Sequence, residues 1–119
     1  MNDSVREHLE MVRDLKKDPE EIMKHATAND LDVLHMAIGM VGEAGEVTEL
    51  VKKDVFNKRQ IPSIEMLKEC GDVLFYMAGL LDSYGWSIED ALDQNVSKLR
   101  TRYPDGYSDA AAAAKADQQ

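Results

Sequence analysis

Two pairs of acidic residues recur at the same spacing in this chain of 119 residues. Glu43 and Glu46 stand three residues apart, and Glu69 and Asp72 repeat that spacing. On a helix, residues three apart share one face. Such pairs are common on solvated helix faces, but these two lie within the apolar segments "LDVLHMAIGMVGEAGEVTELV" and "MLKECGDVLFYMAGLL". Burying an uncompensated carboxylate is costly. The repeated pair therefore favours a site in which a cation compensates the charges over a solvated helix surface.

The four carboxylates predict a divalent metal site. If their two helices pack antiparallel, the pairs face one another and repel unless a cation lies between them. Carboxylate oxygens suit hard ions, so Mg²⁺ is the expected cofactor and Mn²⁺ a substitute for it. Glycine costs about 1 kcal/mol inside a helix, and three glycines beside the acids therefore predict close backbone approach there: Gly42, Gly45 and Gly71.

Glu49 extends the first pair by one further turn. One interpretation makes it a further ligand, a group that supports a ligand, or a catalytic base. The other pairs it with Lys52 or Lys53 on the helix surface. The sequence leaves both open, and it leaves Glu46 and Glu49 as alternative bases.

The elements that must position these acids are helices, since no segment shows convincing strand alternation. We therefore expect an all-α fold of four to five helices, packed antiparallel through short loops. Asn29 or Asp30 is expected to cap the long helix that ends near Phe56, and Ser63 the next one. Gly85 should end that helix, and Ser87 should begin another. The expected helices cover residues 3–17, 29–56, 63–84 and 87–103.

Composition restricts the class of protein. The net charge of −9 argues against electrostatic binding to nucleic acid or to anionic membranes. A metal ion would still let an acidic chain bind a polyanionic small molecule. A single cysteine, Cys70, allows no internal disulfide, and it is expected to be a small buried side chain. The N-terminus is charged and no apolar run reaches the length of a membrane span, so we expect a soluble cytoplasmic protein.

The acids, together with the segments around them and a later segment, resemble the MazG-like, all-α nucleoside triphosphate pyrophosphohydrolases. The resemblance rests on "GEAGEVTELVKK", "KECGDVLFYMAGL" and "NVSKLRTRYPDGYS", in that order. The family signature is ExxE, a spacer, then ExxD, and 22 residues separate Glu46 from Glu69 here. The resemblance runs from His35 to the "RYPDGYS" segment.

The resemblance implies Mg²⁺-dependent hydrolysis of the α–β bond of (d)NTPs, giving (d)NMP and pyrophosphate, with a role in control of nucleotide pools. It implies that Glu43, Glu46, Glu69 and Asp72 hold the metal. Contacts to the nucleotide would come from Lys52, Lys53, Asn95, Lys98, Arg102 and Tyr103. It also makes the tail helix at 107–119 more plausible than a frayed end, with Lys115 and Asp117 as candidate site residues.

The whole chain, residues 1–119, is expected to be one domain with an N-terminal helical segment at 1–28. The central helices are apolar on more than one face, which favours a homo-oligomer, a dimer or a tetramer. Two rival interpretations stay open. A phosphoribosyl-ATP pyrophosphohydrolase would use the same carboxylate arrangement. A non-catalytic helical interaction module would bind neither Mg²⁺ nor nucleotide.

Overall fold

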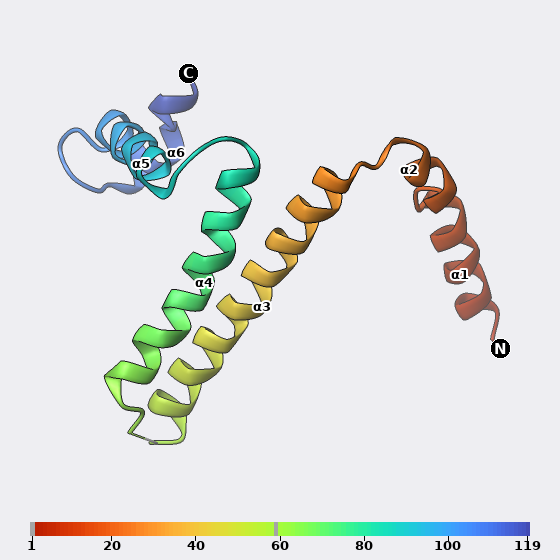
Figure 1. Cartoon of the computed structure of the whole chain (residues 1–119), viewed down its shortest axis with the longest axis horizontal. Helices are drawn as coiled ribbons and strands as arrows, with labels where there is room; N and C mark the ends of the chain where they lie inside the picture. The colour runs from red at the N-terminus through yellow and green to blue at the C-terminus, as the bar shows by residue number, and fades with distance from the viewer. Residues whose placement is uncertain (1, 59) are drawn as a thin grey trace. The chain divides into compact units, whose positions relative to one another are not determined.

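The computed structural model describes residues 2–58 and 60–119, and over these residues it contains helices and no strand (Figure 1). The predicted all-α class is confirmed. The chain divides into two compact units, Met1–Leu31 and Asp32–Gln119. Its elements are α1 (Asp3–Leu15), α2 (Pro19–His25), α3 (Ala28–Phe56), α4 (Ser63–Ser83), α5 (Ile88–Arg102), α6 (Asp109–Ala114) and the 3₁₀ turn η1 (Ala116–Gln118).

The first unit contains α1, α2 and the start of α3. The Asn2 side chain caps α1 by accepting a hydrogen bond from the Val5 amide at 2.9 Å. Asp18 caps α2 by accepting from the Glu20 amide at 3.0 Å, and Pro19 occupies the first turn, as its fixed φ and missing N–H allow. The separate helix α2 was not predicted within the N-terminal helical segment at 1–28.

Two predicted helix starts are wrong by a few residues. At α3, the Thr27 hydroxyl accepts from the Asp30 amide at 3.1 Å, and the Asp30 carboxylate accepts from the Thr27 amide at 2.8 Å. Thr27 is thus the cap in a reciprocal box, and Asp30 is its partner rather than the cap. At α4, Pro62 precedes the helix without a side-chain cap, and Ser63 is already its first residue.

In the second unit, α3 and α4 lie side by side and antiparallel, as predicted (Figure 1). At one end the Ser83 hydroxyl donates to the Asp32 carboxylate at 2.9 Å. Further along, Met36 lies against Gly79, and the Tyr76 ring lies against Gly39. Each step forward along α3 is matched by an equal step backward along α4, so one register holds from the Asp32–Ser83 pair to the Gly39–Tyr76 contact.

The close approach of the helices therefore occurs at glycines other than those predicted. A Cβ at Gly39 would overlap the Tyr76 ring, and one at Gly79 would meet the Met36 sulfur at 2.5 Å. At Gly42, Gly45 and Gly71 a Cβ would meet nothing within 4 Å. The expected close contacts beside the acids are wrong for the single chain, because the space next to these three glycines is open.

The connection from α4 to α5 follows prediction. Gly85 adopts a left-handed φ of 78°, which glycine tolerates without strain, and the Trp86 amide bonds back to the Leu81 carbonyl at 3.0 Å. Ser87 and Asp90 then form the predicted capping box of α5. After a turn at Gly106, the tail forms α6 and the 3₁₀ turn η1, where the sequence predicted one helix at 107–119.

Many large apolar side chains are exposed to solvent, and none of the described residues is fully buried. Ile38, Val41, Leu67 and Phe75 expose 63%, 71%, 67% and 64% of their surface. Cys70 is also exposed, contrary to expectation. Within the described part of the chain, no helix combines the length and apolar character needed to cross a membrane.

Candidate metal centre

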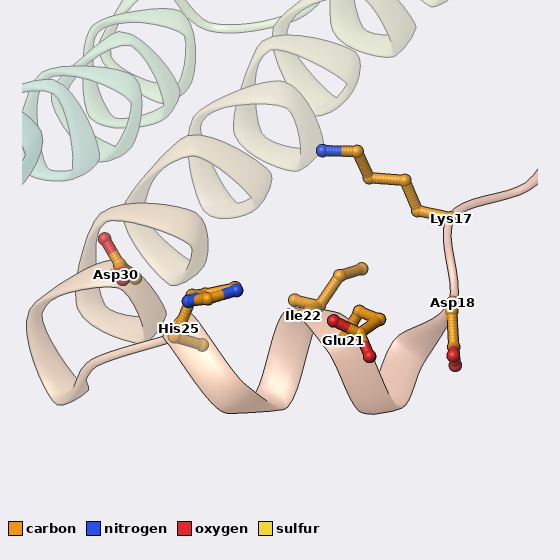
Figure 2. A pocket seen from close by; sticks show the side chains of 7 residues that line it. Lys17, Asp18, Glu21, Ile22, His25 and Asp30 are labelled. Atoms are coloured by element: carbon orange, nitrogen blue, oxygen red, sulfur yellow. The ribbon is translucent and has the colours of Figure 1, made fainter.

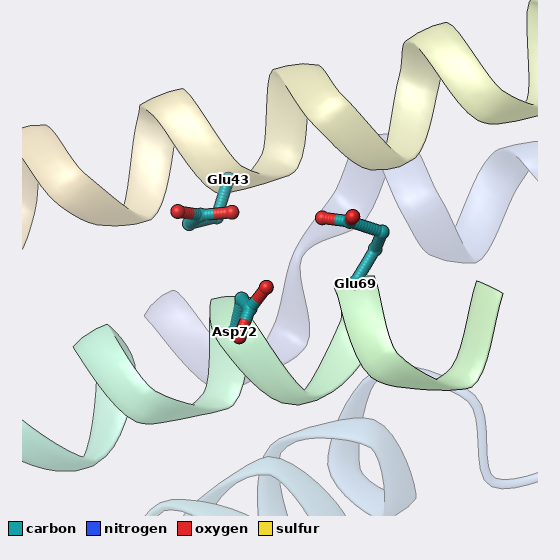
Figure 3. A group of neighbouring side chains, drawn as sticks. All are labelled: Glu43, Glu69 and Asp72. Carbon is teal, nitrogen blue, oxygen red and sulfur yellow. The ribbon is translucent and has the colours of Figure 1, made fainter. Parts of the chain in front are cut away.

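Three of the four predicted metal ligands converge between α3 and α4. Glu43 reaches down from α3 while Glu69 and Asp72 reach up from α4, so that all three carboxylates face the space between the helices (Figure 3). One oxygen from each lies within 4.8 Å of the others. Glu43 and Glu69 are half-buried and Asp72 is exposed. The group continues the register set by Met36, Gly39 and their partners, so the packing of the hairpin positions the acids.

Glu46, the fourth predicted ligand, is not part of this three-carboxylate group in the described structure. It lies exposed one turn further along α3. Its charge still acts on the group. Partial burial raises the pKa of the Glu69 carboxyl above its ordinary value of 4.5, and nearby negative charges raise it further: Asp72, then Glu43, Glu46 and Glu65. The site is thus an electrostatically unfavourable cluster that a bound cation would relieve.

The chemistry of these donors fits Mg²⁺ or Mn²⁺. All three are hard carboxylate oxygens, and the exposed side at Asp72 leaves room for the waters or phosphate oxygens that Mg²⁺ retains in its shell. A thiolate does not suit these ions, so Cys70 next to Glu69 is no candidate ligand.

Glu49 forms the surface pair that the sequence left as one alternative. The Lys52 ammonium lies 3.9 Å from its carboxylate, with both side chains about half exposed. Such a pair contributes little to stability. Lys53, the next predicted phosphate contact, is half-buried on the same helix.

The remaining predicted substrate residues lie on α5 and at its end. Asn95 and Lys98 line a polar hollow of about 640 Å³ that the C-terminal segment completes with Ala116, Asp117 and Gln119. Arg102 is engaged in a bidentate pair with Asp117, at 2.7 Å and 3.1 Å. Tyr103 follows α5 and lies near Tyr107, with ring centroids 5.5 Å apart. The structure therefore groups these residues with the tail and not with the three carboxylates.

Some residues of this hollow were not foreseen. Gln94 and Thr101 line it together with Lys98, and their spacing of four and then three residues is that of one helix face. That spacing could have identified them. Of the two tail candidates, Asp117 reaches the hollow, whereas Lys115 ends α6 in a left-handed conformation with an exposed side chain.

A second hollow, of about 420 Å³, lies in the first unit and contains no predicted site residue. Figure 2 shows Ile22 between His25 and Glu21 along α2, with Lys17, Asp18 and Asp30 around them. This mixture of two apolar side chains, Ile22 and Ala26, with charges of both signs presents no convergent donor set of the kind seen between α3 and α4.

Comparison with known proteins identifies the family of the segment that carries these acids. Residues 31–107 match the model of the MazG nucleotide pyrophosphohydrolase domain. The Gene 37 protein of Mycobacterium phage L5 is 32% identical to this chain over 72 residues. That alignment covers 57% of this chain and 63% of the phage protein, so the chain spans less than two thirds of that relative. No solved structure matches.

Proposed function

Because the chain belongs to the MazG nucleotide pyrophosphohydrolase domain family, we propose that it is a Mg²⁺-dependent nucleoside triphosphate pyrophosphohydrolase. It would cleave the α–β anhydride of (d)NTPs and release (d)NMP and pyrophosphate. The observation that carries the proposal is the convergence of Glu43, Glu69 and Asp72 within 4.8 Å on facing helices. Control of nucleotide pools is the role that such an activity would serve.

In this mechanism Glu43, Glu69 and Asp72 hold the metal, with Glu46 one turn away. A metal bound there would neutralise phosphate charge and would lower the pKa of a bound water. Glu46 is the better candidate for orienting the attacking water, because it is exposed beside the group and influences Glu69. Glu49 is paired with Lys52, and we assign it the role of holding that lysine toward the phosphates.

Asn95 and Lys98 would contact the nucleotide from the hollow on α5. Their amide and ammonium groups can hydrogen-bond polar and anionic parts of a nucleotide. Tyr103 and Lys53 are weaker candidates for nucleotide contacts than Asn95 and Lys98, because neither of them lines that hollow.

We further propose that the chain works as a homo-oligomer. Large apolar side chains on α3 and α4 stay exposed in the single chain, including Val41, Leu67 and Phe75. Large apolar side chains left exposed on two neighbouring helices are expected where another protein surface would cover them. Sedimentation velocity would show the assembly as a species of at least twice the mass of 13.3 kDa.

The decisive experiment measures monophosphate and pyrophosphate from a panel of ribo- and deoxyribonucleoside triphosphates, with Mg²⁺ and with EDTA. Glu69→Gln and Glu46→Gln should abolish release. Glu21→Gln is the matched control, because Glu21 lies on α2 in an exposed pair with Lys24. Orthophosphate release would contradict attack at the α-phosphorus. Turnover restricted to phosphoribosyl-ATP would identify the rival enzyme, and a chain that binds neither Mg²⁺ nor nucleotide would be an interaction module.

A further inference from the structure

One ion pair of the described residues differs in kind from the others. Arg102 Nε donates to Asp117 Oδ1 at 2.7 Å and Nη2 donates to Oδ2 at 3.1 Å, which makes the pair bidentate. The side chains are only 15% and 12% exposed. Four other pairs join residues three apart on one helix and are about half exposed or more. The Arg102–Asp117 pair instead joins α5 to the C-terminal segment.

This pair determines where the last residues of the chain lie. Lys115 ends α6 with a φ of 47°, which turns the backbone back toward α5. The 3₁₀ turn that follows places Ala116, Asp117 and Gln119 opposite the face of α5 that carries Asn95 and Lys98. The tail is therefore one wall of the polar hollow, and α5 is the other.

We propose that Arg102 is a positioning residue, which acts through Asp117 to hold the C-terminal segment as one wall of the nucleotide-binding hollow. The inference rests on the proposed function for the nature of the ligand. It replaces the role of phosphate ligand that the family resemblance implied for Arg102. A guanidinium that already donates to both oxygens of a carboxylate has fewer N–H donors left for a phosphate. Lys98, whose charge also acts on Asp117, stays as the cation of the hollow.

The test uses full-length Asp117→Asn, Arg102→Lys and the exchange of Arg102→Asp with Asp117→Arg. Glu21→Gln is the control, since it removes a carboxylate from an exposed pair with Lys24 at 2.7 Å. Two quantities are measured: KM and kcat for the nucleotide at saturating Mg²⁺, and the rate of tryptic cleavage after Lys115, which reports the position of the tail without any need for turnover.

We expect Asp117→Asn to raise KM and the cleavage rate about tenfold each, the size expected for losing charge-assisted hydrogen bonds, with little change in kcat. The exchange should restore both, and Arg102→Lys should be intermediate because lysine keeps the charge but not the fork. If the exchange fails to fold, the Arg102→Lys and Asp117→Asn results decide the matter.

Four results would overturn the inference. If Arg102 binds phosphate directly, Asp117→Asn leaves KM unchanged or lowers it. If the pair only tethers the tail, cleavage accelerates while KM stays at the wild-type value. A wild-type chain that hydrolyses nucleotide, with all variants unchanged, removes this inference alone. A wild-type chain that neither hydrolyses nucleotide nor is protected from cleavage by Mg²⁺ with an α,β-methylene nucleotide removes both proposals.

Discussion

Gly39→Ala is expected to separate α3 from α4 next to the metal centre. A Cβ at residue 39 would overlap the Tyr76 ring. The ring is held from two sides by edge-to-face contacts, with Phe75 at 5.1 Å and His35 at 6.2 Å between ring centroids. The substitution must therefore move the helices apart, and Gly39 lies one turn before Glu43 on α3.

The magnitude follows from comparison with Gly42→Ala on the same helix. Both changes gain about 1 kcal/mol of helix propensity. At Gly42 the new methyl group meets nothing within 4 Å, so the gain stands alone. At Gly39 overpacking costs about 1–3 kcal/mol. Because the propensity gain is common to both, the two variants should differ by that overpacking cost, which corresponds to about 4–12 °C in Tm.

Thermal melts of both variants with and without Mg²⁺ check this. Gly39→Ala should melt below Gly42→Ala and should show a smaller increase in Tm on adding Mg²⁺. Gly79→Ala should fall between them, because the Met36 thioether that it meets is flexible. A lower Tm for Gly42→Ala than for Gly39→Ala would contradict the expected overlap of residue 39 with the Tyr76 ring. It would mean that another copy of the chain covers Gly42 in the oligomer.

Further predictions concern charges and caps. Glu69→Gln should raise Tm in EDTA and remove the increase that Mg²⁺ produces. Partial burial and, after it, repulsion by neighbouring carboxylates raise the pKa of Glu69, so its charged form costs stability at pH values above the ordinary pKa of 4.5; a lower Tm in EDTA would contradict this. The hydrogen bond from Arg102 lowers the pKa of Asp117 below 3.8, so the Tm advantage of wild type over Asp117→Asn should persist at neutral pH and vanish as pH falls through that lowered pKa. An advantage that grows on acidification would refute the pairing. Thr27→Ala should lower the free energy of unfolding by about 1 kcal/mol in denaturant melts, while Asn29→Ala should change it little, because Thr27 is the cap of α3. Equal effects of the two substitutions would contradict this assignment of the cap.

The sequence was sufficient for features that local rules control. The all-α class, the end of α3 at Phe56, the turn at Gly85 and the Ser87–Asp90 box all follow from helix propensity and capping chemistry. The cap of α3 was misplaced because Thr27, Asn29 and Asp30 are all good capping residues. Only the reciprocal hydrogen bonds distinguish them.

For the site, periodicity was enough to pair Glu43 with Glu69 and Asp72, since spacing of three places each pair on one face and the hairpin makes the faces meet. It was not enough to choose the glycines at the contact. Gly39 and Gly42 are three residues apart on α3, yet only at Gly39 would a Cβ meet a side chain of α4, and that difference depends on the register of the two helices. The partner of Arg102 lies 15 residues away in the tail, and no local pattern predicts a contact of that range.

The exposed apolar surface of the described residues has a thermodynamic consequence. Unfolding raises the heat capacity in proportion to the apolar area that becomes hydrated. A single copy in which no described side chain is buried has little such area left to expose, so it should unfold gradually and with a small heat capacity increment. Calorimetry over a dilution series therefore measures how much of these faces is covered: the increment per chain, and the sharpness of the transition, should rise with protein concentration as copies associate.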